Sequence, residues 1–262
     1  MLEEGSLFAD RYILKHLLGR GGFSEVWLVE DQKSGLDVAL KVYAPYGGLD
    51  DKGTELFCKE FALVFNINQT NLLKPTYYDV YERSPYLILP YCSKGSILSM
   101  VGEVKPDDLL NIIHDVAAGL EYLHRQDPPV IHQDIKPDNI LMGEHGDFLI
   151  TDFGISTKAR STLRKSSMHG ENSGGTYAYM SPEMFPKTPA PIKASDIWSL
   201  GAMAFELAEG FPPFDNMGGV LQKNGADVPV IQSAFPDNVK NLIYKCLSKD
   251  PWDRPTAAEI VQ

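Results

Sequence analysis

The chain has 262 residues, close to the size at which a single hydrophobic core usually divides into two. Hydrophobic residues make up 44% and charged residues 23%, which is typical of a folded globular protein and disfavours disorder. The formal net charge of −11 disfavours nucleic acid as a partner, because a phosphate backbone requires a basic face, and leaves a basic peptide as a candidate.

Cysteine usage and the lengths of the apolar runs indicate the compartment. The three cysteines are widely spaced and form no CxxC pair, so we interpret them as reduced thiols of a cytoplasmic protein and not as disulfides or zinc ligands. The N-terminal residues MLEEGSLFADRYIL are acidic and lack the apolar run of a signal peptide. No apolar stretch reaches the roughly 18–20 residues that cross a bilayer, so no membrane segment is expected.

The pattern of apolar residues changes in the short connector at residues 92–95. Before it, alternating apolar residues over 11–42 predict short strands joined by glycine-rich turns, followed by a helix over 54–67 and strands over 76–81 and 86–89. After it, helices are predicted over 106–126, 194–209, 237–247 and 256–262. We therefore expect two domains, 1–92 with a small sheet and one helix, and 93–262, which is mainly helical.

The centre of the chain, residues 127–191, is expected to be rich in loops. Within it, residues 158–175 hold many Ser, Thr, Gly and basic residues without periodicity. A loop of this length in a compact domain is usually functional or mobile.

A glycine-rich turn, GRGGFSEV, joins the first two predicted strands. By itself it indicates only a tight hairpin. Gly19, Gly21 and Gly22 also leave backbone that approaches phosphates closely, and Ser24 stands where a third glycine would complete the pattern GxGxxG.

Lys41 ends the apolar strand VALK, fifteen residues after Val26. One interpretation is an edge charge whose ammonium group reaches water. The other is a fixed cation on the phosphates of ATP, which requires a carboxylate to hold it. Glu60 on the following helix is the candidate, and Glu55 is its competitor.

The segment IHQDIKPDNIL, residues 131–141, carries the sharpest signal. Asp134, Lys136 and Asn139 fall in an order that an ordinary polar loop does not predict, and Asp152 follows in TDFG. Phosphoryl transfer needs in-line positioning and cations on the moving charge. An aspartate that orients a hydroxyl, a lysine, and an Asn–Asp pair on magnesium meet that need.

These segments resemble a eukaryotic-type protein kinase domain from about Tyr12 to Ile260. The glycine-rich loop, VALK, HQDIKPDN, DFG and SPE follow one another in the family's order, and DIWSLG matches its central buried helix. Arg254 in DRPT matches the arginine that pairs with Glu183. The resemblance implies a two-lobed α+β fold, with an antiparallel sheet lobe carrying one helix and a larger, mainly helical lobe.

The resemblance also implies roles, residue by residue. Lys41 would contact the α- and β-phosphates and pair with Glu60, Asp134 would orient the substrate hydroxyl, and Lys136 would steady the γ-phosphate. The remaining roles concern adenine, magnesium and the substrate type. Adenine would be enclosed by Val26, Ala39 and Leu141, with Leu89 behind it, and its edge would form hydrogen bonds with backbone groups of Pro90 and Cys92. Magnesium would be held by Asn139 and Asp152. The serine/threonine type is indicated by Lys136 together with Thr176.

Three positions depart from the family's pattern. Ser24 replaces a glycine, and its small side chain can be accommodated there. Pro90 replaces an acidic residue at a site that uses the backbone carbonyl, and proline keeps that carbonyl. Gln133 replaces the arginine of HRD, so the chain is a non-RD variant whose loop phosphate would lack that partner.

Two other classes compete with an active protein kinase. A pseudokinase would have lost Lys41, Asp134, Asn139 or Asp152, and all four are present. A small-molecule kinase shares the HxDxxxxN loop but would lack the peptide-docking segment 176–183. We expect a protein or peptide substrate, basic before the acceptor, and transient self-association for autophosphorylation. Because the last predicted helix runs to Gln262, we also expect a catalytic domain cut from a longer chain.

Overall fold

The computed structural model describes residues 2–21, 24–44, 46–65, 67–153, 177–185 and 191–262. The described residues form two compact units. The N-terminal unit contains residues up to 68 and residues 73–91, and the C-terminal unit contains residues 69–72, 92–153 and 177 onward.

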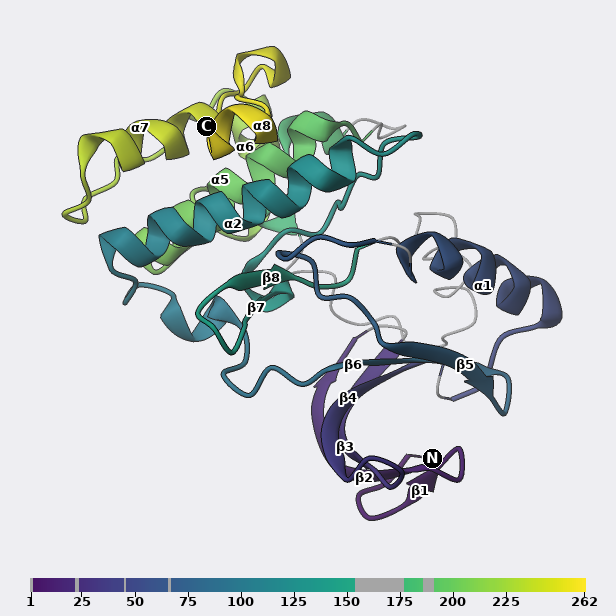
Figure 1. Ribbon diagram of the computed structural model, residues 1–262. Coiled ribbons are helices and arrows are strands. Elements are labelled where there is room, and N and C mark those ends of the chain that lie inside the picture. Colours follow the sequence, from purple (N-terminus) through teal and green to yellow (C-terminus); the bar gives the residue numbers. More distant parts are fainter. Residues whose placement is uncertain (1, 22–23, 45, 66, 154–176, 186–190) are drawn as a thin grey trace. The chain divides into compact units, whose positions relative to one another are not determined.

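The N-terminal unit is built on a six-stranded antiparallel sheet (Figure 1). Its strand order is β1-β2-β3-β4-β6-β5. The strands are β1 (Leu7–Phe8), β2 (Tyr12–Arg20), β3 (Ser24–Asp31), β4 (Leu36–Tyr43), β5 (Tyr77–Tyr81) and β6 (Ser84–Pro90). The predicted strands are confirmed. The sequence did not indicate β1, because two residues are too short to show an alternating pattern.

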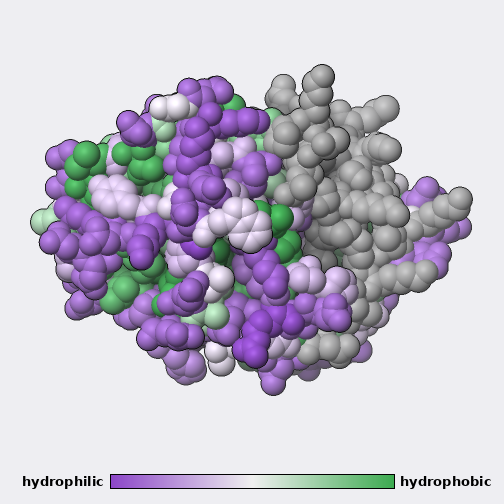
Figure 2. Space-filling view, turned by 90° about the horizontal axis from the view of Figure 1, so that it is seen from above, coloured by the Kyte–Doolittle hydropathy of each residue, from purple (hydrophilic) through white to green (hydrophobic). Residues whose placement is uncertain are grey.

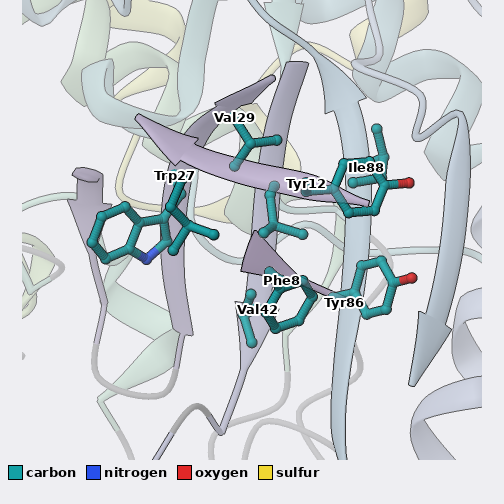
Figure 3. Packing of buried hydrophobic residues seen from close by; sticks show 9 residues of the cluster. Phe8, Tyr12, Trp27, Val29, Val42, Tyr86 and Ile88 are labelled. Atoms are coloured by element: carbon teal, nitrogen blue, oxygen red, sulfur yellow. The ribbon is translucent and has the colours of Figure 1, made fainter. Parts of the chain in front are cut away.

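Strand alternation gives this sheet two different faces. One face carries a cluster of apolar and aromatic side chains, shown in Figure 3. The cluster consists of Phe8, Tyr12, Leu14, Trp27, Val29, Leu40, Val42, Tyr86 and Ile88. Phe8 from β1 lies edge-on to Tyr86, with ring centroids 5.1 Å apart, so the N-terminal strand helps to close this core.

Helix α1 (Asp51–Phe65) packs against aromatic residues of the sheet. The ring centroid of Phe57 lies 4.7 Å from that of Tyr43, and the centroid of Phe61 lies 5.1 Å from that of Tyr78. The helix starts three residues before the predicted start at 54. Asp50 explains the difference, because its Oδ1 accepts a hydrogen bond from Gly53 N at 2.7 Å and satisfies a donor of the first turn.

The C-terminal unit is mainly helical, as predicted. Its α-helices are α2 (Pro106–His124), α5 (Lys193–Glu209), α6 (Gly219–Lys223), α7 (Asp237–Cys246) and α8 (Ala257–Val261). Its 3-10 helices are η1 (Ile97–Met100), η2 (Pro137–Asn139), η3 (Pro182–Met184), η4 (Asp215–Met217) and η5 (Pro251–Asp253). Helix α5 is buried on nearly all sides and contacts both α2 and α7, so it is the centre of this core.

A short antiparallel hairpin in the C-terminal unit was not predicted as strands. It consists of β7 (Ile140–Met142) and β8 (Phe148–Ile150), in the region expected to be loops. Three-residue strands leave too little alternation to detect in a sequence. The hairpin places residue 139 at one end of a strand and residue 151 at the end of the neighbouring strand.

The surface drawn in Figure 2 is mostly hydrophilic, with hydrophobic side chains in small separate groups. Scattered apolar residues are normal on the surface of a folded protein. Among the described residues, no helix combines the length and apolarity required to span a membrane.

Acid should weaken the N-terminal unit through a bidentate ion pair. Arg11 Nε and Nη2 donate to the two carboxylate oxygens of Asp31 at 2.7 and 2.8 Å. These hydrogen bonds outweigh desolvation and hold the pKa of Asp31 well below its usual value. The unfolded chain therefore takes up this proton first, so the stabilisation is present above about pH 4 and is lost as pH falls through the folded pKa.

We therefore expect Arg11→Met to lower stability at pH 7 and to flatten its loss in acid. The measurement is the urea unfolding midpoint of both proteins between pH 7 and pH 2.5. Parallel curves for the variant and the parent would contradict this assignment.

Candidate active site

Asp134 lies in the loop before η2 and is held by Asn139. Asn139 Nδ2 donates to the backbone oxygen of Asp134 at 2.7 Å and to its Oδ2 at 2.9 Å. The other carboxylate oxygen, Oδ1, is buried and accepts no hydrogen bond from the described residues. It lies 3.3 Å from Lys136 Nζ, within ion-pair distance. One oxygen of Asp134 is therefore fixed, and the other retains its capacity to accept a hydrogen bond.

His132 links this loop to the end of β8. Its Nδ1 accepts a hydrogen bond from Asp134 N at 3.2 Å, and its Nε2 lies 2.9 Å from Thr151 O. A carbonyl only accepts, so the proton is assigned to Nε2 and the ring is neutral. The buried ring thus fixes the backbone of Asp134 relative to the residue that precedes Asp152.

Asp196 on α5 is fully buried and holds the same loop by hydrogen bonds to its backbone. Its Oδ2 accepts from His132 N and its Oδ1 from Gln133 N, both at 2.8 Å, and Oδ2 also lies 2.8 Å from His124 Nε2. Gln133 has a φ of 67°, a left-handed conformation that is unfavourable for a residue with a side chain. The hydrogen bonds that His132 N and Gln133 N donate to Asp196 stabilise this conformation.

From the sequence, Asp196 had no predicted role beyond its place in DIWSLG. A signal was present, because an aspartate inside an apolar helix requires partners for its buried charge. The partners themselves are 63 and 64 residues away along the chain, and only the tertiary structure identifies them.

Asp152 follows β8 and is close in backbone position to Asn139. Thr151 N donates to Asn139 O at 2.9 Å, which continues the pairing of the β7–β8 hairpin by one residue. Asp152 itself has a φ of 64°, again left-handed. The structure therefore places four predicted residues of the C-terminal unit in one region: Asp134, Lys136, Asn139 and Asp152.

Four predicted nucleotide-binding residues of the N-terminal unit share one face of the sheet. In the strand register, Val26 lies opposite Lys41, and Ala39 lies opposite Leu89. This face is opposite the one that carries the cluster of Figure 3, since residues alternate along each strand. Lys41 is buried, and its Nζ lies 5.4 Å from the ring centroid of Tyr43.

The other predicted nucleotide-binding residues lie at the ends of strands or in the C-terminal unit. Gly19 pairs with Val26 near the end of β2, and Pro90 ends β6. In the C-terminal unit, Leu141 lies in β7 and Cys92 is half-buried. Burial raises the pKa of the Cys92 thiol, and nearby carboxylates raise it further, so this thiol remains protonated at neutral pH.

Some predicted residues lie outside the described part of the structure. Gly21 is described, and its N–H donates to Ser24 O at 2.8 Å, but Gly22 is not. Thr176 also lies outside the described residues, as does the Ser- and Thr-rich segment 158–175. Position 60 belongs to α1, but the Glu60 side chain is not described.

The predicted pairing of Arg254 with Glu183 is confirmed. Arg254 Nη1 and Nη2 donate to the two oxygens of Glu183 at 2.7 and 2.9 Å. The remaining donors of this buried guanidinium bond backbone carbonyls, at Ala194, Ser248 and Lys249. Burial opposes ionisation of Glu183, but the bonds and charge of Arg254 outweigh it and lower the pKa of Glu183.

An acidic pair lies beside the segment that follows residue 176. Tyr179 OH donates to Glu206 Oε2, and burial together with the nearby charge of Asp138 raises the pKa of Glu206. Asp138 is exposed, whereas Glu206 is buried. Glu206 therefore has an internal partner, and Asp138 is the acid of this pair that is open to solvent.

Comparison with known proteins agrees with the resemblance in the sequence. The family model described as "Protein kinase domain" matches residues 12–262. A fission-yeast Aurora kinase (Schizosaccharomyces pombe) is 32% identical over 251 residues, which cover 94% of this chain and 68% of the relative. The serine/threonine-protein kinase dst1 of Dictyostelium discoideum is 31% identical over 261 residues, which cover 95% of this chain and 34% of the relative.

A bacterial relative extends the comparison. Serine/threonine-protein kinase PrkC of Bacillus subtilis is 30% identical over 266 residues, which cover 97% of this chain and 40% of the relative. The chain thus spans about a third to a half of the length of several of its curated relatives. The predicted α+β kinase fold is confirmed, and the chain belongs to the protein kinase domain family as an ATP-dependent phosphotransferase domain of the serine/threonine type.

Proposed function

We propose that this domain phosphorylates serine and threonine hydroxyls of protein substrates, including its own, with Asp134 as the residue that orients the hydroxyl. The observation that carries the assignment is the asymmetry of Asp134. Asn139 holds its Oδ2, while its buried Oδ1 lies beside Lys136 and accepts no hydrogen bond within the part of the chain that the structure describes. A buried carboxylate oxygen without a donor is suited to accept the substrate hydroxyl.

Lys136 supplies positive charge next to this oxygen, 3.3 Å away. A cation at that position stabilises negative charge that develops on the transferred phosphoryl group. Thr176 is assigned a hydroxyl contact near Asp134 and Lys136, in keeping with the serine/threonine type.

Asn139 and Asp152 fit a magnesium ion by their chemistry. The amide nitrogen of Asn139 donates to two oxygens of Asp134, so its amide oxygen points away from them. Exchanging the amide nitrogen and oxygen would place an oxygen against the oxygens of Asp134, which is unfavourable. Amide and carboxylate oxygens are ligands that Mg²⁺ accepts. Bound Mg²⁺ would neutralise charge on the phosphates of ATP.

The nucleotide is assigned to the sheet face that carries Lys41. The glycines near the end of β2 and Lys41 would contact phosphates, and the apolar residues would contact adenine. Glu60 is assigned as the partner of Lys41, because position 60 is three residues from Phe57, which packs on Tyr43. Position 55 points to a different side of α1, since two residues along a helix turn by about 200°.

We assign residues 1–92 to the N-terminal lobe and residues 93–262 to the C-terminal lobe. We assign the protein to the cytoplasm. The test of the function is transfer of radiolabelled γ-phosphate from Mg-ATP to a generic basic protein, compared with Lys41→Met. Transfer by the parent and its loss in the variant are expected. A pseudokinase would show no transfer, and a small-molecule kinase would not phosphorylate protein.

Substrate preference should be basic before the acceptor residue. Asp138 is exposed and lies near the buried Glu206, so this region attracts a positive side chain. The residue after the acceptor should be apolar, since Tyr177 is 45% exposed and Met180 is half-buried in the same segment. On a peptide array, we expect Asp138→Asn to reduce the basic preference about threefold or more, whereas the exposed Asp107→Asn on α2 should not change it. An acidic preference in the parent would contradict the assignment.

Loop phosphorylation should not be required for activity, because Gln133 is neutral and does not attract a phosphate. The hydroxyls concerned are Ser161, Thr162, Ser166, Ser167 and Ser173, which lie outside the described residues. Alanine at all five should leave the initial rate within a few-fold of that of phosphatase-treated parent enzyme. A loss of about a hundredfold, nearly 3 kcal/mol, would show that the loop is a phosphoswitch.

A further inference from the structure

A buried carboxylate lies at the base of the glycine-rich turn. Glu25 is 2% exposed and lies opposite Arg20 in the β2–β3 residue pair that is nearest the turn. Its side of β3 is that of Trp27, so it faces away from Val26 and Lys41. Glu25 therefore does not lie on the proposed phosphate-binding face, and another reason is needed for a charge at this place.

The partners of Glu25 come from three different segments. Arg20 Nη2 on β2 lies 2.9 Å from Oε1, and Trp27 Nε1 on β3 donates to Oε2 at 3.0 Å. Tyr46, in the connection between β4 and α1, donates its hydroxyl to Oε1. The Arg20 guanidinium also lies 5.9 Å from the ring centroid of Tyr46, at cation–π distance. The four side chains form one closed group, the Glu25 cluster.

Trp27 ties the Glu25 cluster to the core. Its ring belongs to the apolar cluster of Figure 3, with its indole nitrogen at the edge of that group. A buried carboxylate with one partner removed is strongly unfavourable, so the partners of Glu25 hold their positions together. The base of the glycine-rich turn is thereby joined to the apolar cluster of the sheet.

Tyr46 ties the Glu25 cluster to a fixed loop. Leu49 N donates to Arg83 O at 2.8 Å, and Arg83 Nε donates to Leu49 O at 3.2 Å, which attaches this loop to the turn between β5 and β6. Gly48 has a φ of 64°, and a Cβ there would lie 2.7 Å from Arg83 Cβ, so the two turns are in close contact. Tyr46 is thus an anchored donor in the connection between β4 and α1, although it is 63% exposed.

We infer that Glu25 and Tyr46 are positioning residues that hold the base of the glycine-rich hairpin against the connection between β4 and α1 and so set the affinity for nucleotide. The inference rests on the proposed nucleotide-binding function of this sheet. Joining the hairpin to the connection before α1 prepares the hairpin for phosphate binding, because less conformational freedom is then lost when nucleotide binds. The hydrogen bond to Glu25 also raises the pKa of Tyr46, which keeps its hydroxyl a donor at neutral pH.

The test is Tyr46→Phe, with Tyr77→Phe as the matched control. Both are exposed tyrosines of the N-terminal unit whose hydroxyls donate to a carboxylate, but Tyr77 bonds Asp79 on the edge strand β5. We expect Tyr46→Phe to weaken ADP binding in calorimetry and to raise KM for ATP about three- to tenfold, with kcat within about twofold. Tyr77→Phe should change neither.

Glu25→Gln tests whether the two residues act together. It should also weaken ADP binding. The double variant should bind ADP little more weakly than whichever single variant has the lower affinity, because both changes disrupt the same group of side chains. A Tyr46→Phe protein with normal ADP affinity and KM, or with a lower melting temperature alone, would overturn the inference. Failure of the proposed function would appear differently, as absence of phosphotransfer in the parent, and calorimetry with ADP would still test the Glu25 cluster.

Discussion

Asp152→Ala should abolish phosphotransfer, with a loss of about a thousandfold or more in kcat, roughly 4 kcal/mol of transition-state stabilisation. The change removes a carboxylate assigned to Mg²⁺ without removing core volume, so the domain should remain folded. Asp152 has a left-handed φ of 64°, a conformation that alanine adopts poorly. Asp152→Asn is therefore measured alongside, since asparagine tolerates this conformation and lacks the charge.

The rate is measured with saturating Mg-ATP and a protein substrate, and folding is checked by thermal melting. Glu144→Ala, which removes an exposed acid from the β7–β8 turn, is the control and should keep the parent's rate. Asn139→Ala should also abolish transfer, but it removes two hydrogen bonds to Asp134 as well and is a less specific test. Near-parent turnover by both Asp152 variants would show that the metal assignment is wrong.

Arg254→Met should destabilise the domain by about 3–5 kcal/mol, because it leaves the carboxylate of Glu183 without its counter-charge. The Arg254 side chain is fully buried, and its guanidinium bonds both oxygens of Glu183 and three backbone carbonyls. Urea unfolding of the purified domain measures the loss. The matched control is Arg125→Met, which removes an exposed arginine paired with Glu121 one helical turn away. That change should cost less than about 0.5 kcal/mol.

A double variant separates charge from packing at this site. Adding Glu183→Gln to Arg254→Met removes the uncompensated charge and should restore part of the lost stability. Ser195 Oγ, which donates to Glu183 Oε1 at 2.9 Å, would retain a carbonyl oxygen as acceptor. A loss below about 1 kcal/mol for Arg254→Met would show that the pair contributes little to folding.

The sequence by itself determined the fold class, most elements and the residue types of the candidate site. The long periodic segment of α2 and the short apolar runs of β3 and β4, bounded by turn residues, are patterns typical of a helix and of buried strands. The order of Lys41, Asp134, Asn139 and Asp152 along the chain was sufficient to indicate phosphoryl transfer. The Arg254–Glu183 pair, 71 residues apart, was predictable only because the resemblance supplied it.

The tertiary structure alone decided which polar groups hold the loops. Asp196 accepts bonds from residues more than sixty positions away, and Glu25 has a partner 21 positions away. Such contacts leave no local pattern, because a hydrogen bond depends on the position and direction of two atoms and not on their separation in sequence. The short strands β1, β7 and β8 were also decided by tertiary pairing, since two or three residues carry too little periodicity to specify a strand.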